Sequence, residues 1–161
     1  MSMNQEYVKY LFDYDDLEGK LKWKNHYSRS DRNGNYAGSI NGKGYYCVAI
    51  NNKSFRLHRL IWLYHKGYLP DIIDHIDGNR LNNKIENLRE ATIQQNSANK
   101  AGLGSNTGFK GVRWVQSRKK YKATINHNGI AYYLGLFINL EEAVESYRKK
   151  NLELNGEFAK F

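Results

Sequence analysis

The sequence predicts an α+β protein. A strand-rich N-terminal part leads into a short strand–turn–strand–helix module, and a three-stranded antiparallel sheet packed on one helix follows. Three observations predict this class. Short apolar segments between turn residues fill positions 6–56, a helical spacing of apolar residues begins at Leu57, and three strand-like segments precede an amphipathic stretch in residues 109–161. A chain of 161 residues accommodates one domain or two small ones.

Residues 6–56 contain five segments with strand character, which are EYVKYLFDYD, KLKWK, NYAGSI, GYYCVAI and SFRLH. Pairs of residues that favour turns separate them, namely Glu18-Gly19, Asn33-Gly34, Asn41-Gly42 and Asn51-Asn52. A helix is expected next, because apolar residues recur at helical spacing until helix breakers end the pattern. The recurring residues are Leu57, Leu60, Ile61 and Tyr64, and the breakers are Gly67 and Pro70.

Residues 71–99 are expected to form a strand, a turn, a second strand and a helix. IIDHI is a short apolar strand, Asp77-Gly78-Asn79 is a turn, and IENLREA contains the second strand. The helix is expected over 91–99, with Thr92 as its N-cap. Residues 100–108, KAGLGSNTG, are polar and rich in glycine, which is typical of a linker. We therefore expect one domain at 1–99 and another at 109–161.

In the last section, FKGVRWV, KYKATIN and AYYLGLF are the three expected strands. His127-Asn128-Gly129 forms the turn between the second and the third. An amphipathic helix, LEEAVESYRKKNLELNG, follows and ends at Gly156. Its apolar stripe consists of Leu140, Ala143, Val144, Tyr147 and Leu154. A sheet of this size backed by one helix can bury a small core.

The chain is strongly basic, with a net charge of +9 and a pI of 9.5. No Asp or Glu occurs between Thr92 and Leu140, whereas seven Lys and Arg residues do, interleaved with Phe109, Trp114 and Tyr121. Such a stretch is typical of surfaces that bind the phosphates of nucleic acids, and double-stranded DNA is the partner expected from the motifs described below. A membrane is not expected as a partner, because no apolar run approaches the ~18 residues of a spanning segment and the basic stretch has strand character.

The first residues and the cysteine content indicate in which compartment the protein acts and which cross-links it can form. The first residues lack an apolar signal core, so we expect a cytoplasmic protein, located in a bacterial host cell if it is phage-encoded. Cys47 is the single cysteine, which excludes an internal disulfide and a structural zinc site of the Cys₄ or Cys₂His₂ type.

Asp74 and His75, followed by Asn87 and Asn96, suit phosphodiester hydrolysis. A neutral imidazole at His75 could take a proton from water near pH 7. The Asp74 carboxylate and the Asn96 amide oxygen are hard ligands, suited to one Mg²⁺ or Mn²⁺ ion. Such an ion would polarise a phosphate and stabilise the leaving oxygen. An Asp-His pair alone is common by chance, and it is the combination that predicts a DNA-cutting enzyme.

Residues 57–99 resemble the HNH endonucleases of the ββα-metal class, in particular phage homing endonucleases encoded in group I introns. The resemblance rests on HRLIW, DHIDGNRLNN, IENLREAT and QQNSAN, in this order. It implies that His75 is the general base, that Asp74 and Asn96 are the metal ligands, and that Asn87 braces the hairpin and orients His75. The third residue of the motif is Asn here and not His, which leaves the choice of metal open. Asn99, on the same helical face as Asn96, is the alternative ligand.

Residues 109–161 resemble the AP2 DNA-binding domain, through GVRW, YKATI, YYLGLF, EEAVESY and LELNGEFAKF. The resemblance implies that the sheet lies in the major groove of DNA. It places on or near the DNA the residues Arg113, Trp114, Lys120, Lys122 and Tyr133. Arg59, in the preceding section, could touch a phosphate. Lysine replaces several of the arginines expected in the strands, and because lysine acts as a point charge, the module is expected to position more than it specifies.

A monomer with one such centre is expected to cut one strand per engagement, so the prediction is nicking. The main alternative is a sequence-specific DNA-binding regulator with an inactive nuclease module, against which the intact Asp74-His75 pair argues. An RNA-binding protein is a third reading that rests only on positive charge and tyrosines.

Overall fold

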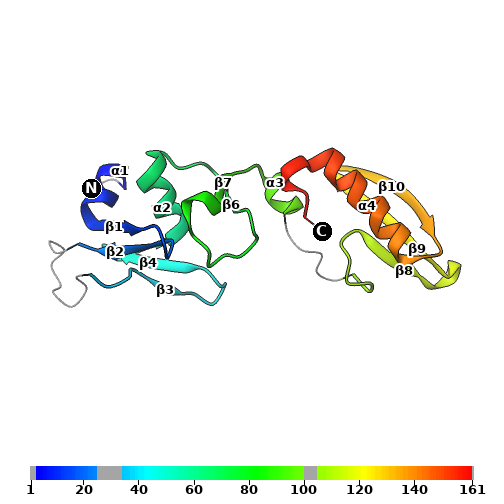
Figure 1. The fold of residues 1–161 in the computed structure, drawn as a ribbon, viewed down its shortest axis with the longest axis horizontal. Coiled ribbons are helices and arrows are strands. Elements are labelled where there is room, and N and C mark those ends of the chain that lie inside the picture. The colour runs from blue at the N-terminus through cyan, green and yellow to red at the C-terminus, as the bar shows by residue number, and fades with distance from the viewer. Residues whose placement is uncertain (1–2, 25–33, 100–104, 161) are drawn as a thin grey trace. The chain divides into compact units, whose positions relative to one another are not determined.

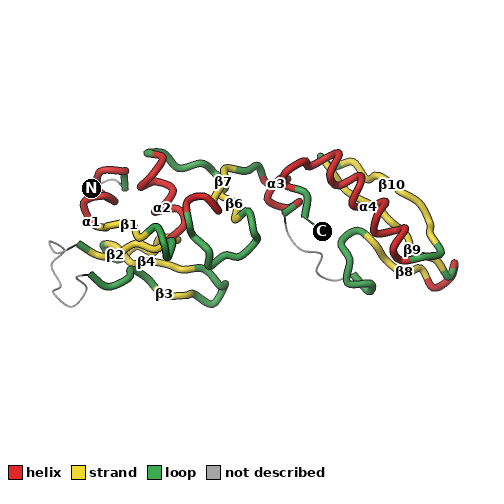
Figure 2. Tube along the Cα trace, viewed as in Figure 1, coloured by secondary structure: helices red, strands yellow, loops and turns green. Residues whose placement is uncertain are grey.

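The computed structural model describes residues 3–24, 34–99 and 105–160. Within these ranges the chain is a mixed α+β structure whose sheets are all antiparallel, which confirms the predicted class in its general form (Figure 1, Figure 2). The chain divides into two compact units, Met1–Glu90 and Ala91–Phe161. Each unit has its own hydrophobic core. In the described part of the chain, no helix combines the length and the apolar character that a membrane crossing requires.

In its described residues, the first unit contains two α-helices, one short 3₁₀ helix and three small sheets. Helix α1 (Gln5–Leu11) precedes the hairpin of β1 (Phe12–Asp15) and β2 (Lys20–Trp23). Strands β3 (Ser39–Ile40), β4 (Tyr46–Ile50) and β5 (Lys53–Arg56) form a meander in that order. Helix α2 (Leu57–Lys66) follows directly, and β6 (Ile73–His75) pairs with β7 (Leu88–Glu90), which the short helix η2 (Ile85–Asn87) precedes.

The predicted first strand is wrong over EYVKYL, which is helical in α1. The Asn4 side chain accepts a hydrogen bond from the backbone N–H of Tyr7 and so caps the helix. Val8 and Leu11 are three positions apart and both fully buried, which is the spacing of one helical face. A capped amphipathic turn therefore overrides the strand preference of the tyrosines and valine, and only FDYD forms a strand.

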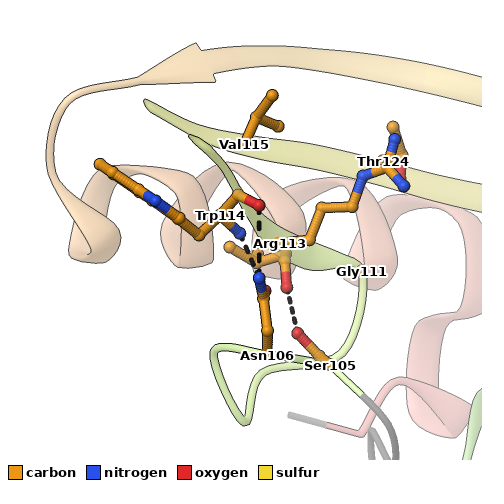
Figure 3. Close-up of a pocket in the computed structure, with 8 residues that line it drawn as sticks. Ser105, Asn106, Gly111, Arg113, Trp114, Val115 and Thr124 are labelled. Atoms are coloured by element: carbon orange, nitrogen blue, oxygen red, sulfur yellow. Dashed lines mark hydrogen bonds between the residues drawn. The ribbon is translucent and has the colours of Figure 1, made fainter. Parts of the chain in front are cut away.

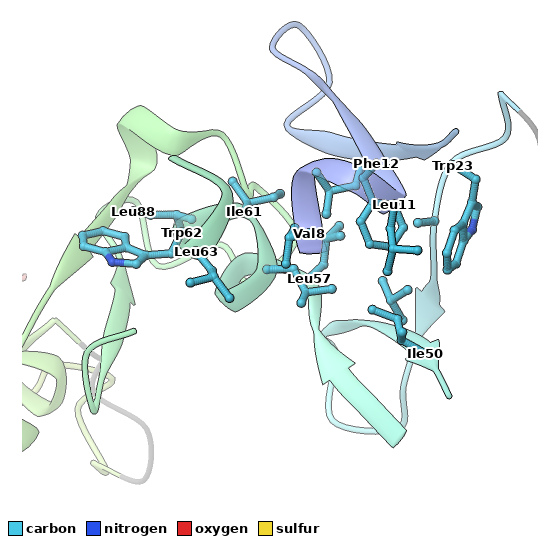
Figure 4. Packing of buried hydrophobic residues seen from close by; sticks show 14 of the residues in the cluster. Val8, Leu11, Phe12, Trp23, Ile50, Leu57, Ile61, Trp62, Leu63 and Leu88 are labelled. Atoms are coloured by element: carbon cyan, nitrogen blue, oxygen red, sulfur yellow. The ribbon is translucent and has the colours of Figure 1, made fainter. Parts of the chain in front are cut away.

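Helix α2 lies at the centre of the first core (Figure 4). Leu57, Leu60, Ile61 and Leu63 are buried, and α2 packs against α1, β2, β4 and β5. Gly67 ends the helix as predicted, in a left-handed conformation with its N–H bonded to the Leu63 carbonyl. Each of these apolar side chains contributes about 1.5–3 kcal/mol by leaving water, so α2 is the scaffold against which the hairpin of β6 and β7 is built.

The second unit contains the predicted sheet and helix. Strands β8 (Val112–Val115), β9 (Lys120–His127) and β10 (Ile130–Phe137) form an antiparallel sheet in the order β10-β9-β8, with η3 (Gln116–Arg118) between β8 and β9. Helix α4 (Leu140–Asn155) packs on this sheet, and η4 (Gly156–Phe158) follows it. Ala143, Val144 and Tyr147 are buried, and burial raises the pKa of Tyr147 to about 12.

Helix α3 (Ile93–Ala98) also belongs to the second unit. Thr92 is its N-cap, as predicted, and forms a reciprocal capping box with Gln95. The Lys110 ammonium donates to the carbonyls of Ser97 and Ala98, 2.9 and 2.8 Å away, at the C-terminal end of α3. The helix that the sequence analysis grouped with β6 and β7 therefore packs with α4 and η4. Within the predicted linker, residues 100–104 lie outside the described residues, and the linker stays a prediction.

One irregularity interrupts the sheet of the second unit. The pairing of β10 with β9 shifts by one residue between Tyr133 and Gly135, which is a β-bulge. Before the bulge Tyr133 lies opposite Thr124, and after it Phe137 lies opposite Tyr121. Tyr133 is 61% exposed, whereas Phe137 packs against the core.

Substitution of Gly111 tests how closely the second unit is packed around this residue. Its φ is +73°, and a Cβ there would lie 2.5 Å from the Thr124 carbonyl oxygen and still closer to the Tyr147 ring. We expect Gly111→Ala to destabilise the protein by about 1–2 kcal/mol from the left-handed backbone and by a further 1–3 kcal/mol from overpacking. Gly129→Ala is the matched control, because its φ is +76° but nothing lies within 4 Å. Equal losses in chemical denaturation would contradict the packing argument.

Candidate active site

The hairpin of β6 and β7 presents the predicted Asp74-His75 pair. Asp74 lies opposite Arg89 and His75 opposite Leu88. The Ile76 N–H donates to the Asn87 carbonyl, which extends the pairing by one bond. All three residues of β6 are buried, with Asp74 and His75 each 5% exposed. A buried polar pair needs specific partners, because an unsatisfied group costs about 1–3 kcal/mol.

Asn83 is a partner of His75. His75 Nε2 lies 2.9 Å from Asn83 Oδ1, and Asn83 is only 1% exposed. The Asn83 amide nitrogen donates to the Leu81 carbonyl, 3.4 Å away, so the amide oxygen faces the imidazole. An amide oxygen can only accept a hydrogen bond, so a neutral His75 that bonds to Asn83 Oδ1 carries its proton on Nε2. This tautomer is the form that could act as a base through Nδ1.

Asn87 braces the loop between the two strands. Its amide nitrogen donates to Asp77 Oδ1 and to the Asn82 carbonyl, and its oxygen accepts from the Asp77 N–H. Burial acts to raise the pKa of Asp77, but the hydrogen bonds from Asn82, Asn79 and Asn87 outweigh it and hold the pKa below its usual value. Asp77 is therefore ionised at neutral pH and anchors the loop that carries Asn83.

His58, on α2, packs its ring against the His75 ring at 5.0 Å between centroids, edge to face. Burial lowers the pKa of His58 to about 3, and the neighbouring His75, Arg56 and Arg59 act in the same direction. His58 is therefore neutral at physiological pH and adds no positive charge beside His75.

The two predicted metal ligands lie in different units. Asp74 is on β6, and its Oδ2 accepts from Arg89 Nε at 3.0 Å, in a buried ion pair. Asn96 is half-buried on α3 of the second unit, and Asn99 is the buried C-cap of that helix. The structure thus brings together Asp74, His75 and Asn87, whereas the pairing of Asp74 with Asn96 or Asn99 stays a prediction.

The donor chemistry of these residues fits a hard divalent ion. Mg²⁺ is commonly held by one or two carboxylates, with water and substrate phosphates completing its shell. Asp74 offers a carboxylate, and Asn96 or Asn99 offers an amide oxygen. Across the described ranges, no cluster of three or more His, Cys, Asp and Glu side chains is suited to a metal. A site with few protein ligands is consistent with an ion that also binds a phosphate of the substrate.

Four of the five predicted DNA-contacting residues of the second unit share one face of its sheet. Arg113 lies opposite Lys122, Lys120 alternates with Lys122, and Lys122 Nζ lies 5.6 Å from the centre of the Tyr133 ring. This face is opposite to the one that bears buried Val112 and Ala123.

Trp114 is the fifth residue, and it lies on the other face. It is adjacent to Arg113 in β8, and the two side chains point in opposite directions beside a pocket of the second unit (Figure 3). Its ring packs edge to face on Tyr121, and its backbone bonds to the Asn106 side chain. Arg59, in the first unit, donates to the Asp71 carbonyl.

Comparison with known proteins identifies the family. Residues 55–98 match the family model described as HNH endonuclease. An uncharacterized HNH endonuclease of Acanthamoeba polyphaga mimivirus is 43% identical over 121 residues, which cover 73% of this chain and 63% of that protein. Protein 3.8 of Escherichia phage T7 is 38% identical over 112 residues, which cover 68% of this chain and 92% of that protein. The chain belongs to the HNH endonuclease family.

The HNH match contains Asp74, His75, Asn87 and Asn96 in one segment. Residues 109–161 lie outside that match, so their likeness to an AP2 domain stays a prediction. The chain spans less than two thirds of the length of the mimivirus relative. Among solved structures, the HNH homing endonuclease I-HmuI is 21% identical with a TM-score of 0.48, and the alignment covers 83% of this chain and 77% of that chain.

Sequence reasoning missed Asn83, and for His58 it allowed either a position under the active site or a structural role at the start of a helix. Asn83 follows Asn82 in a stretch rich in asparagine, where such residues ordinarily form turns. Only its burial and its contact with His75 single it out. His58 stands at the start of a helix, and helical spacing gives no sign that its ring reaches β6.

Asn83 can be tested by replacing its amide. Asn83→Leu removes the acceptor of the His75 Nε2 proton at similar volume. We expect ¹⁵N NMR of the His75 ring to show loss of the single Nε2–H tautomer, and the unfolding free energy to fall by about 1–3 kcal/mol. Asn83→Asp keeps an acceptor and should keep the tautomer. An unchanged tautomer in Asn83→Leu would contradict the role.

His58 makes the stability of the protein depend on pH. Its folded pKa of about 3 lies below its usual value of 6.5, so the unfolded chain binds a proton between these limits and the folded chain does not. Stability should therefore fall as pH drops from 6.5 towards 3, by up to about 1.4 kcal/mol per unit. Urea unfolding in EDTA at pH 7, 6 and 5 measures the slope, which should be shallower in His58→Gln. Identical slopes would show that the buried His58 does not resist protonation.

Proposed function

We propose that this chain is a metal-dependent endonuclease of the homing type that nicks one strand of duplex DNA, with His75 as the general base. The observation that carries the proposal is the buried Asp74-His75 pair on β6, with His75 Nε2 bonded to the buried amide of Asn83. Membership of the HNH endonuclease family supports it.

In this proposal His75 Nδ1 removes a proton from a water molecule as that water attacks the phosphorus. A bond forms between the water oxygen and phosphorus, and the bond to the 3′ oxygen breaks. Asp74 would hold one Mg²⁺ or Mn²⁺ ion, with Asn96 as the other ligand or Asn99 as the alternative. The ion would supply charge stabilisation at the phosphate and at the leaving oxygen. Asn87 acts through the loop, by holding Asp77 and hence the segment with Asn83.

In this proposal the second unit binds the DNA backbone. Arg113, Lys120, Lys122 and Tyr133 form a basic face with one exposed aromatic ring, which suits a phosphate backbone. An AP2-like placement of this sheet in the major groove, a contact from Arg59, a monomeric state and action in the cytoplasm of a bacterial host are parts of the same proposal. A monomer with one such centre would leave a nick.

One observation favours a second candidate, a DNA-binding regulator with an inactive nuclease module. Arg89 Nε lies 3.0 Å from Asp74 Oδ2, so a buried cation already engages the carboxylate that would hold the metal. If this ion pair persisted with DNA bound, the second unit would carry the function alone.

Conversion of supercoiled plasmid carrying mixed phage DNA inserts separates these candidates. We expect open circles from the wild type with Mg²⁺ or Mn²⁺ and none with EDTA. His75→Ala should cut about 10²- to 10⁴-fold more slowly, because a general base contributes this much, and should retain DNA binding. His65→Ala is the matched control, since His65 is an exposed histidine near the end of α2.

Equal cleavage by His75→Ala and wild type would remove His75 as the base. A linear product would indicate paired cutting of both strands. No cleavage on any insert, with a retained gel shift that weakens with salt, would favour the regulator. Stronger binding to duplex RNA than to DNA would favour the RNA-binding reading.

A further inference from the structure

Two arginine side chains lie against one aromatic ring in the first unit, and a lysine lies next to them. Lys43 lies in the turn between β3 and β4, Arg56 ends β5, and Arg80 lies in the loop after β6, and all three are exposed. The guanidinium carbons of Arg56 and Arg80 lie 4.6 and 5.0 Å from the centre of the Tyr45 ring. Arg80 Nη1 also donates to the Lys43 carbonyl at 3.1 Å. Segments far apart in the sequence thus converge on Tyr45, and we call these four residues the Tyr45 cluster.

Asn41 holds the backbone of this cluster in place. Its side-chain oxygen accepts from the N–H groups of Lys43 and Tyr45, and its own N–H donates to the Tyr45 carbonyl. The turn is therefore closed by three hydrogen bonds, and Tyr45 enters β4 with its ring half-buried. A ring fixed in this way is a rigid platform on which guanidinium groups can stack.

The cluster borders the HNH site. The Tyr45 ring centre lies 5.6 Å from that of His58 and 6.4 Å from that of His75. Together with the cation–ring distances, this places both guanidinium groups within about 11 Å of the His75 ring. That span is roughly three steps of one DNA strand, at 3.4 Å per step along the helix axis.

Among the described residues, no acidic side chain forms an ion pair with the cluster, whose charged members are Lys43, Arg56 and Arg80. An open groove runs beside them, lined by Asn41, Gly42, Lys43, Cys47, Ser54 and Arg56. Lys43 and Arg56 line this groove, and Arg80 lies against the same Tyr45 ring as Arg56, so the three exposed cations suit a polyanion better than a single carboxylate ligand.

We infer that the Tyr45 cluster binds phosphates of the DNA strand within about three nucleotides of the bond that His75 acts on. Stacking on Tyr45 leaves the N–H groups at the guanidinium edge free to bind a phosphate in a bidentate way, and it limits the side-chain freedom lost on binding. The cluster is separate from the basic face of β8, β9 and β10, so each unit has its own contact with the backbone. The inferred distance of the contact from the cleaved bond rests on the proposed nuclease function. The contact with DNA phosphates rests on the cluster itself.

Salt dependence of binding to duplex DNA in EDTA tests the inference without cleavage. We expect the slope of log K against log salt concentration to decrease in magnitude by about 0.9 for Arg56→Gln or Arg80→Gln, and by about twice that for the double variant, because each lost phosphate contact releases one counterion fewer. Lys53→Gln is the matched control, since Lys53 is an exposed cation on the same strand, β5, and lies three residues from Arg56. It should leave the slope unchanged.

Arg56→Lys and Arg80→Lys keep the charge and should restore the wild-type slope, which separates a charge contact from a folding defect. Phosphate ethylation interference should then locate the affected phosphates within three nucleotides of the nick. Slopes equal to wild type in the double variant, or the same change in Lys53→Gln, would overturn the inference even if the wild type cuts DNA. A larger loss on duplex RNA would overturn the choice of DNA. A changed slope with no cleavage by the wild type would leave the contact standing and defeat the proposed nuclease.

Discussion

The hydrogen bond between His75 and Asn83 is the interaction on which the geometry of the candidate site depends. A histidine that is 5% exposed cannot rely on water to satisfy its ring, so the protein must supply the partner. Asn83 does so from a loop with little regular structure, and that loop is held in turn by Asp77 and Asn87. Asn87 therefore stabilises the loop, and the loop in turn holds Asn83 against the imidazole of His75. Asn87, the residue in the middle of the HNH motif, thus belongs to the network that holds the His75 ring, because its amide bonds to Asp77 and Asn82.

Helix α2 supports the hairpin of β6 and β7. Leu60, Ile61 and Leu63 fix this helix in the first core, and the same helix carries His58 to the face of His75. Because His58 is neutral, it fills the space beside the His75 ring without adding a positive charge there. Core packing and site chemistry are therefore coupled through one helix, and the polar network and the apolar core stabilise each other.

The sequence predicted those elements whose signals are local. Gly67 ends α2, Thr92 caps α3, and the three strands and the helix of the second unit occupy their expected segments. The strand predicted over EYVKYL is wrong, because the cap at Asn4 and the burial of Val8 and Leu11 outweigh β-propensity. Asp74, His75 and Asn87 lie together as the motif implied, whereas the placement of Asn96 on α3 leaves its partnership with Asp74 a prediction. Asn83 and the Tyr45 cluster were missed, since both depend on contacts between segments distant in sequence, which periodicity does not encode.

The bulge in β10 allows one strand to contribute side chains both to the core and to the outer face of the sheet. In a regular strand, residues four positions apart point the same way, so Tyr133 and Phe137 would share a face. The one-residue shift before Gly135 reverses the alternation, and the strand changes phase partway along its length. Tyr133 is thereby turned towards solvent beside Lys122, while Phe137 turns inward to the core. A single inserted residue thus allows an aromatic-rich strand to divide its rings between the interior and the outer face without a break in the sheet.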